Sequence, residues 1–274
     1  MINLVILDLD GTLLTDEKRV TQNTLAAIDK YHKKGVQFAV CTGRSMIEAT
    51  HISEISEVFS YCDYVITSGG GSIASLKDFK RLYTFNIARD KVKQIYNSIK
   101  DKENMFEVFV DDKAFCPSDA LVDYKEYIHQ AFFTLIKETS IPVKDMSKFL
   151  DESKGNITML FISFKNQKTR DEAYEIISKL DGIKAHLSWT QAIEVVLEGV
   201  DKGESVKKLA EIINVKKENI MCMGDSYNDI PMRKACDTLV AMGNGIDELK
   251  NIADFVTLTN NEGGIEHALE KFLN

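Results

Sequence analysis

The stretch Asp8-Leu9-Asp10-Gly11-Thr12 decides the fold, because it follows a run at residues 2–7 that is apolar except for Asn3. Such a run is typical of a strand buried on both faces of a parallel sheet. Strand side chains two residues apart point to the same side, so Asp8 and Asp10 are expected to face the crevice beyond the strand's carboxyl end. Gly11 then permits a tight turn. A polar loop after a strand explains these five residues equally well, so the stretch alone does not settle a function.

The first and last thirds of the chain alternate apolar runs with helical patterns, which is the signature of βαβ units. We therefore predict an α/β fold with a Rossmann-like, doubly wound parallel sheet. Further strands are predicted at residues 36–41, Tyr64–Thr67, 220–223, Thr238–Ala241 and 255–258, and helices after Thr21, at 204–213, from near Pro231, and at 264–272.

The middle of the chain differs in character, because its predicted strands alternate polar and apolar residues. Alternation indicates a sheet with one exposed face, which is more typical of α+β than of doubly wound folds. We predict that residues 82–188 form an inserted α+β cap domain and that residues 1–81 and 189–274 form the core.

The composition limits which classes of partner and which cellular compartment fit the protein. A net charge of −8 argues against nucleic acid or an anionic membrane as the main partner, since both need a positive field. No apolar stretch approaches the ~20 residues that span a bilayer, and the N-terminal residues lack the pattern of a secretion signal. Five cysteines, an odd number without a Cys-x-x-Cys pair, indicate reduced thiols. We expect a cytoplasmic protein that does not bind membranes.

Two motifs add groups that suit an anion. Thr42-Gly43-Arg44 follows the second predicted strand and offers a hydroxyl, a backbone N–H and a guanidinium, which are groups that hold phosphate oxygens. Asp201-Lys202-Gly203 directly precedes a predicted helix, where a lysine can reach the crevice beside the positive end of the helix dipole. Taken singly, a helix-opening turn and a surface lysine are the more common interpretations.

Another motif, Gly224-Asp225-Ser226-Tyr227-Asn228-Asp229, follows the strand predicted at residues 220–223. Two carboxylates and an amide at one strand end form an oxygen-rich environment suited to a hard metal ion. An N-capping turn explains Asp229 but not Asp225. All four motifs lie at strand carboxyl ends or a helix amino end, so they converge on one crevice.

The four motifs, in this order, resemble those of the haloacid dehalogenase superfamily. The insertion between the second and third motifs, the Gly-Asp-x-x-Asn-Asp form and the ending Asn261-Glu262-Gly263-Gly264-Ile265 are similar to its Cof-type, IIB-capped phosphatases. The resemblance covers the core closely and the cap only in pattern.

This resemblance implies a phosphatase in which Asp8 becomes an aspartyl phosphate and Asp10 acts as general acid and base. All-oxygen ligands favour Mg²⁺ over zinc, and a divalent ion would offset the repulsion between the phosphate and the carboxylates. The implied phosphate-binding groups are Leu9, Thr42, Gly43, Lys202 and Asn228, and the implied metal ligands are Asp8, the Asp10 carbonyl, Asp225 and Asp229.

One departure concerns Ser68-Gly69-Gly70-Gly71, where relatives often carry Asn-Gly-Ala; three glycines are expected to loosen this loop. The cap is expected to set specificity, with Phe115, His186, Ser188 and Trp189 as candidate lining residues. The expected substrate is a small phosphorylated metabolite, and the default oligomeric state is a monomer. Two alternatives remain open at this stage: a sugar phosphomutase or phosphotransferase of the same fold, and a phosphometabolite sensor without turnover.

Overall fold

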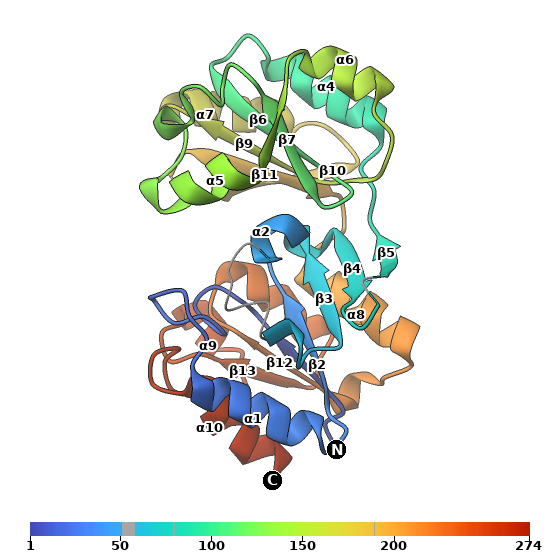
Figure 1. The fold of residues 1–274 in the computed structure, drawn as a ribbon, viewed down its shortest axis with the longest axis vertical. Helices are drawn as coiled ribbons and strands as arrows, with labels where there is room; N and C mark the ends of the chain where they lie inside the picture. Colours follow the sequence, from blue (N-terminus) through green and yellow to red (C-terminus); the bar gives the residue numbers. More distant parts are fainter. Residues whose placement is uncertain (51–57, 79, 189) are drawn as a thin grey trace. The chain divides into compact units, whose positions relative to one another are not determined.

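The computed structural model describes residues 1–50, 58–78, 80–188 and 190–274 (Figure 1). The chain divides into two compact units. The larger unit contains Met1–Arg44, the segment that ends at Tyr83, and Asp201–Asn274. The smaller unit contains Thr84–Val200 together with the short helix α2 (Met46–Thr50). All four motifs therefore fall in the larger unit.

An eight-stranded sheet forms the centre of the larger unit, in the order β14-β13-β12-β1-β2-β3-β4-β5. The strands from β14 to β3 are parallel, and β4 joins β3 antiparallel. Its strands are β1 (Leu4–Leu7), β2 (Gln37–Cys41), β3 (Tyr64–Thr67), β4 (Ser72–Ser75), β5 (Arg81–Thr84), β12 (Ile220–Gly224), β13 (Thr238–Ala241) and β14 (Phe255–Val256). Its helices are α1 (Gln22–His32), α8 (Lys202–Ile213), α9 (Asp247–Lys250) and α10 (Gly264–Leu273), with 3-10 turns η1 (Ser68–Gly70), η4 (Lys217–Asn219) and η5 (Tyr227–Lys234).

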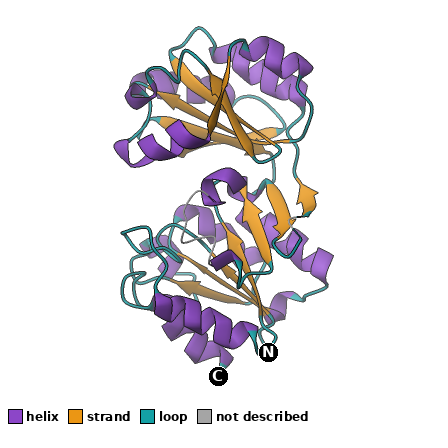
Figure 2. Ribbon diagram, viewed as in Figure 1, coloured by secondary structure: helices purple, strands orange, loops and turns teal. Residues whose placement is uncertain are grey.

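Helices cover both faces of this sheet (Figures 1 and 2). Val206 and Leu209 of α8 pack on the apolar side chains of β1, β2 and β12, and all of these are fully buried. On the opposite face, α1 packs beside α10. Thr21 is the predicted N-cap of α1, and its hydroxyl accepts a hydrogen bond from the N–H of Thr24. The predicted α/β, doubly wound fold class is confirmed.

One predicted helix start is wrong. The segment expected to begin near Pro231 is the 3-10 helix η5, which already begins at Tyr227. The reason is local hydrogen bonding: the Asp229 carboxylate accepts from the N–H of Ser226 and so closes the first turn four residues earlier.

The smaller unit is built on a six-stranded sheet in the order β10-β11-β9-β6-β7-β8. Its strands are β6 (Asn104–Val110), β7 (Lys113–Pro117), β8 (Ser140–Val143), β9 (Ile157–Phe164), β10 (Ile183–Ser188) and β11 (Ala192–Leu197). Its helices besides α2 are α4 (Arg89–Ile99), α5 (Phe133–Thr139), α6 (Met146–Glu152) and α7 (Gln167–Ile177), with 3-10 turns η2 (Tyr124–Glu126) and η3 (Gln130–Phe132).

The alternation expected of this sheet is only partly right, because β6 and β9 are buried on both faces. Helices α4, α6 and α7 pack on one face, where Phe106 and Leu160 lie in the unit's main apolar core. On the other face, Met105 packs with residues of α5 and the loops before it. Glu107 lies on that second face, 1% exposed, and burial together with the nearby Glu48 raises its pKa to about 8.

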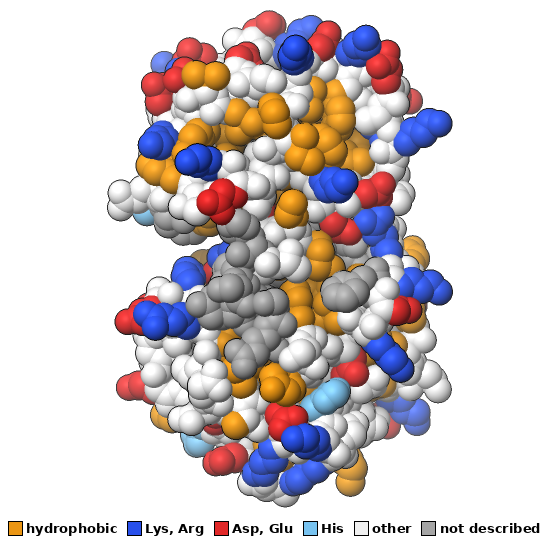
Figure 3. All heavy atoms as spheres, in the orientation of Figure 1, with side chains coloured by type: hydrophobic (Ala, Val, Ile, Leu, Met, Phe, Trp, Pro, Cys, Tyr) orange, Lys and Arg blue, Asp and Glu red, His pale blue; other side chains and the backbone are white. Residues whose placement is uncertain are grey.

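No helix of the described residues is long and apolar enough to cross a membrane. All five cysteines are buried and form no disulfide. On the face drawn in Figure 3, Lys and Arg side chains are interspersed with Asp and Glu side chains.

Candidate active site

The order of the strands explains why the motifs meet. Strand β1 lies between β12 and β2, and all three run parallel, so their carboxyl ends share one edge of the sheet. Asp8 follows β1, Thr42 follows β2 and Asp225 follows β12. The amino end of α8 brings Lys202 to the same edge. The predicted convergence of the four motifs therefore holds in the larger unit.

Lys202 links two of the carboxylates. Its Nζ lies 2.5 Å from Asp8 Oδ1 and 2.6 Å from Asp229 Oδ1. The Lys202 side chain is 1% exposed, and those of Asp8 and Asp229 are 7% and 0% exposed. The lysine starts α8 directly after its N-cap, Asp201, whose carboxylate accepts from the N–H of Glu204. A buried ammonium bonded to two buried carboxylates is a costly arrangement to build, because each ion loses its water.

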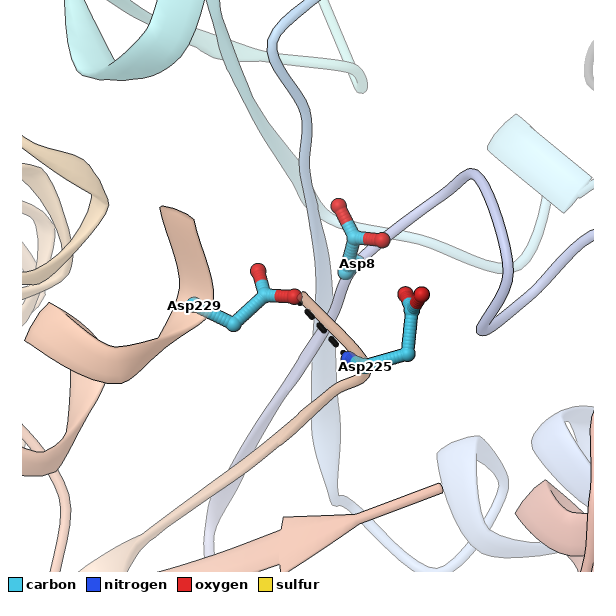
Figure 4. Close-up of side chains that lie close together, drawn as sticks. All are labelled: Asp8, Asp225 and Asp229. Carbon is cyan, nitrogen blue, oxygen red and sulfur yellow. Dashed lines mark hydrogen bonds between the residues drawn. The ribbon is translucent and has the colours of Figure 1, made fainter. Parts of the chain in front are cut away.

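The third carboxylate, Asp225, belongs to the fourth motif and contacts the first. Its Oδ1 accepts from the Thr12 hydroxyl at 3.1 Å, and its backbone N–H donates to Asp229 Oδ2 at 2.9 Å. Gly11 has φ +84°, and a Cβ there would lie 2.5 Å from Asp225 Oδ2. Only glycine fits, since both the backbone conformation and the space exclude a side chain. Figure 4 shows the carboxylates of Asp8, Asp225 and Asp229 converging on one space.

Asp10 faces different partners. Its Oδ2 accepts from Arg44 Nε at 2.7 Å, and its Oδ1 accepts from Arg44 Nη2 and Lys18 Nζ, both at 2.8 Å. The guanidinium that the sequence offered to a phosphate is thus engaged by Asp10. Lys18 was not predicted, because it lies in a loop eight residues beyond Asp10 where no periodic pattern points to the site.

These surroundings shift the pKa values in opposite directions. Burial raises the pKa of Asp8 well above its ordinary value, and the Asp229 charge raises it further against the opposing effect of Lys202. Burial and Asp229 likewise raise the pKa of Asp225. Burial acts to raise the pKa of Asp10 too, but the hydrogen bonds and charges of Arg44 and Lys18 outweigh it and lower that pKa. Asp10 is therefore poised as a carboxylate.

For Lys202, burial lowers the pKa, but Asp229 and Asp8 more than offset this and hold the pKa well above its ordinary value. The lysine is therefore a permanent positive charge among the carboxylates. In their ionised forms the three carboxylates exceed this single ammonium by two negative charges, and that repulsion agrees with the raised pKa of Asp8 and of Asp225.

The other predicted phosphate-binding residues lie around this edge. Thr42 is buried, and its hydroxyl accepts from the N–H of Arg44 at 3.1 Å. Gly43 follows it, and Leu9 lies between the two catalytic candidates with its side chain fully buried. Asn228 is exposed on η5, next to Asp229. The described contacts do not test their binding of phosphate, so that role stays a prediction.

The loop with three glycines is held rather than loosened. Its residues form η1, and the N–H of Ser68 donates to the Arg44 carbonyl at 2.8 Å. The carbonyl of Gly70 accepts from Ser205 Oγ of α8 at 2.5 Å. A Cβ on Gly70, which has φ +109°, would lie 2.7 Å from the Asp201 carbonyl oxygen. The glycine thus permits close packing of this loop on the start of α8.

The candidate lining residues of the smaller unit differ in the residues that surround them. The Phe115 ring packs on Phe149 at 4.7 Å between centroids, so it belongs to that unit's apolar core. Ser188 donates to Glu194, the residue directly opposite His186 in the sheet. Trp189 lies outside the described residues. None of these settings tests a role in specificity.

The donor set fits a hard divalent cation. One carboxylate oxygen from each of Asp8, Asp225 and Asp229 lies within 4.8 Å of the others. Carboxylate oxygens are the ligands that Mg²⁺ prefers, and a divalent charge matches the two negative charges in excess. The Asp10 carboxylate is not part of this group, in keeping with its predicted ligand atom being the backbone carbonyl.

A family model of haloacid dehalogenase-like hydrolases matches residues 5–269, so the chain belongs to this family. The resemblance drawn from the four motifs is confirmed.

Curated relatives match over nearly their whole length. The 5-amino-6-(5-phospho-D-ribitylamino)uracil phosphatase YitU of Bacillus subtilis is 29% identical over 283 residues, which cover 99% of this chain and 97% of that protein. Phosphatase YwpJ of the same organism is 26% identical over 289 residues, covering 98% and 99%.

Solved structures show the same fold. TM0651 from Thermotoga maritima superposes with a TM-score of 0.84 at 25% identity, covering 100% of this chain and 98% of that one. The subclass IIB sugar phosphatase BT4131 gives a TM-score of 0.79 at 22% identity, covering 98% of each chain.

Proposed function

We propose that this protein is a Mg²⁺-dependent phosphatase that hydrolyses small phosphorylated metabolites through an aspartyl phosphate on Asp8. The observation that carries the proposal is the position of Asp8, which lies at the end of β1, bonded to the buried Lys202 and grouped with Asp225 and Asp229. A pure binding site for phosphate does not need three carboxylates. They suit a site that holds a metal ion and supplies a nucleophile.

In the first step, an Asp8 oxygen attacks phosphorus and the bond from phosphorus to the ester oxygen breaks. Asp10 gives its proton to the departing alkoxide. Arg44 and Lys18 favour the ionised form of Asp10 in the free protein, so the proton must be gained as substrate binds. A phosphate of about two negative charges nearby acts in that direction, because it disfavours a further carboxylate.

In the second step, Asp10 takes a proton from water, which attacks the phosphorus of the aspartyl phosphate. The bond from phosphorus to Asp8 breaks, inorganic phosphate is released, and the Asp8 carboxylate is regenerated. The ionised form favoured by Arg44 and Lys18 is the form that this step requires. Lys202 stays protonated throughout and stabilises the negative charge of the transferring group.

Five groups are proposed to hold the phosphoryl oxygens: the Thr42 hydroxyl, the N–H groups of Leu9 and Gly43, Lys202 and Asn228. Asp8, the Asp10 carbonyl, Asp225 and Asp229 are proposed to hold Mg²⁺. When bound, the ion supplies positive charge that lowers the repulsion between phosphate and carboxylates. Each unit pair of like charges costs about 4 kcal/mol at 4 Å and an effective dielectric near 20.

Removal of the metal should abolish turnover. We expect phosphate release to stop in excess EDTA and to return when Mg²⁺ is added beyond the chelator. The reason is that Lys202 alone leaves two negative charges uncompensated. A colorimetric phosphate assay measures this, with EDTA already saturated by Mg²⁺ as the control. Full activity in free chelator would refute the metal assignment.

Asp10→Asn should slow alkyl phosphates more than p-nitrophenyl phosphate. The variant keeps an oxygen for Arg44 but cannot protonate a leaving group, and p-nitrophenolate leaves without a proton. General acid catalysis contributes about 10²–10⁴-fold, so the first-step loss should reach that range for alkyl esters. Single-turnover rates of enzyme phosphorylation measure it. Equal losses on both substrates would contradict the acid role.

The substrate class is tested by a phosphate-release screen over several dozen phosphorylated metabolites. We place sugar phosphates and 5-amino-6-(5-phospho-D-ribitylamino)uracil first in that panel, since relatives act on these classes. Transfer of labelled phosphate within a sugar, without free phosphate, would indicate a mutase instead. Tight binding without release across the panel would indicate a sensor.

The remaining assignments are also proposals. Residues 1–81 and 189–274 are assigned to the catalytic core, and residues 82–188 to the cap that selects substrates. We further propose that the protein acts in the cytoplasm as a monomer, in keeping with its five unpaired, buried cysteines.

A further inference from the structure

Loop residues 15–19 carry Lys18 back to Asp10. The N–H of Thr15 donates to the carbonyl of Arg19, and the N–H of Lys18 donates to the carbonyl of Thr15, both at 2.9 Å. Lys18 adopts φ +61°, in the left-handed region, which turns the chain sharply. Its Nζ then lies 2.8 Å from Asp10 Oδ1, although more than half of the lysine side chain is exposed.

An amide pair from the other end of the chain anchors this loop. Asn261 Oδ1 accepts from the N–H of Asp16 at 3.0 Å, and Asn261 Nδ2 donates to Asp16 Oδ2 at 2.9 Å. Asn260 Nδ2 donates to Asp16 Oδ1 at 3.1 Å and to the carbonyl of Leu14 at 2.9 Å. In each of these contacts the two partners lie 244 to 246 positions apart in the sequence. None of the contacts involves the catalytic carboxylates.

Among the described residues, the contacts on Asp10 leave one lone-pair site of its carboxylate open. A carboxylate offers about four lone-pair sites. Arg44 and Lys18 together occupy Oδ1, and Arg44 alone occupies one site on Oδ2. Without Lys18, both oxygens keep an open site, and the carboxylate is held by a single side chain.

We propose that Lys18, held in place by the pairing of Asp16 with Asn261, is a positioning residue that orients Asp10 so that the second lone-pair site of Oδ2, beside its bond from Arg44, can exchange a proton. Lys18 acts through Asp10, and Asp16 acts through Lys18. The inference rests on the proposed function, since it assigns a role in that reaction. An exposed ion pair contributes little to stability, so the effect should appear in turnover rather than in folding.

The test compares kcat and KM for Lys18→Met, Asp16→Ala and the double variant. We expect Lys18→Met to lower kcat about 10-fold with KM within about twofold, because misorientation of a catalytic group affects the transition state selectively. Asp16→Ala should lower kcat by a few-fold. The double variant should match Lys18→Met, since residues that act in series are not additive. Lys18→Arg should recover most of the loss.

A matched control is Lys33→Met, which removes another exposed lysine that pairs with a carboxylate, here Asp29 at 2.6 Å. Its kcat and the urea midpoints of all variants should stay at the wild-type values. An unchanged kcat for Lys18→Met, or an additive loss in the double variant, would overturn the positioning role. The phosphatase proposal would still stand if the wild-type protein turned over and Asp10→Asn slowed alkyl phosphates more than p-nitrophenyl phosphate. Wild-type protein that released no phosphate from any substrate would refute both.

Discussion

The Asp8→Asn variant should lose phosphatase activity by a factor of about 10⁴ or more, as expected when a covalent nucleophile is removed. Asparagine keeps the shape of the side chain and an oxygen for Lys202, whose Nζ lies 2.5 Å from Asp8 Oδ1. It lacks the charge and nucleophilicity needed to attack phosphorus. Initial rates of phosphate release at saturating Mg²⁺ measure the loss.

The control is Asp29→Asn, which makes the same chemical change at a surface pair with Lys33. This variant should retain wild-type turnover. If Asp8→Asn also turned over at the wild-type rate, the covalent mechanism would be wrong, whatever the substrate.

Lys202→Met should reduce both stability and activity. Removing one partner of a buried ion pair typically costs about 3–5 kcal/mol, because the other charges remain buried without compensation. Here the charges left behind are those of Asp8 and Asp229, which are 7% and 0% exposed. The free energy of unfolding in urea, measured without metal, should fall by that amount. Turnover should fall by orders of magnitude, because the transferring phosphoryl group loses its buried cation.

Mg²⁺ should restore part of the stability that Lys202→Met loses, since the ion would offset the same carboxylates. The control is Lys207→Met on the same helix, where the lysine pairs with Glu204 at 2.8 Å and its side chain is 41% exposed. Surface pairs contribute about 0–1 kcal/mol, so this variant should stay near wild type. Equal unfolding free energies for the two variants would contradict the account of Lys202.

Much of the core and the site could be predicted from the sequence. Strand β3 was predicted at its observed bounds and β1 and β2 to within two residues, because buried parallel strands read as unbroken apolar runs. The meeting of Asp8, Thr42 and Asp225 followed from the rule that ligands bind at the carboxyl ends of parallel strands, and the place of Lys202 followed from its position at the amino end of a helix.

The parts that were missed depend on contacts between distant residues. Lys18 lies in a loop that Asn260 and Asn261 contact through Asp16, and no local pattern encodes a contact across more than 240 positions. The guanidinium of Arg44 was counted among the groups suited to phosphate, because the sequence does not reveal that it pairs with Asp10. The second buried face of β6 was missed for a similar reason, since α5 and its preceding loops cover it from later in the chain.

The most direct test of the central claim is to trap the intermediate on Asp8. Wild-type protein is mixed with substrate and Mg²⁺, quenched in acid and treated with borohydride, which reduces an acyl phosphate to an alcohol. Peptide mass spectrometry should then find homoserine at position 8 in the wild-type protein with substrate, and aspartate at that position without substrate. Rapid phosphate release with position 8 unmodified at every quench time, or homoserine at position 10 instead, would contradict the account.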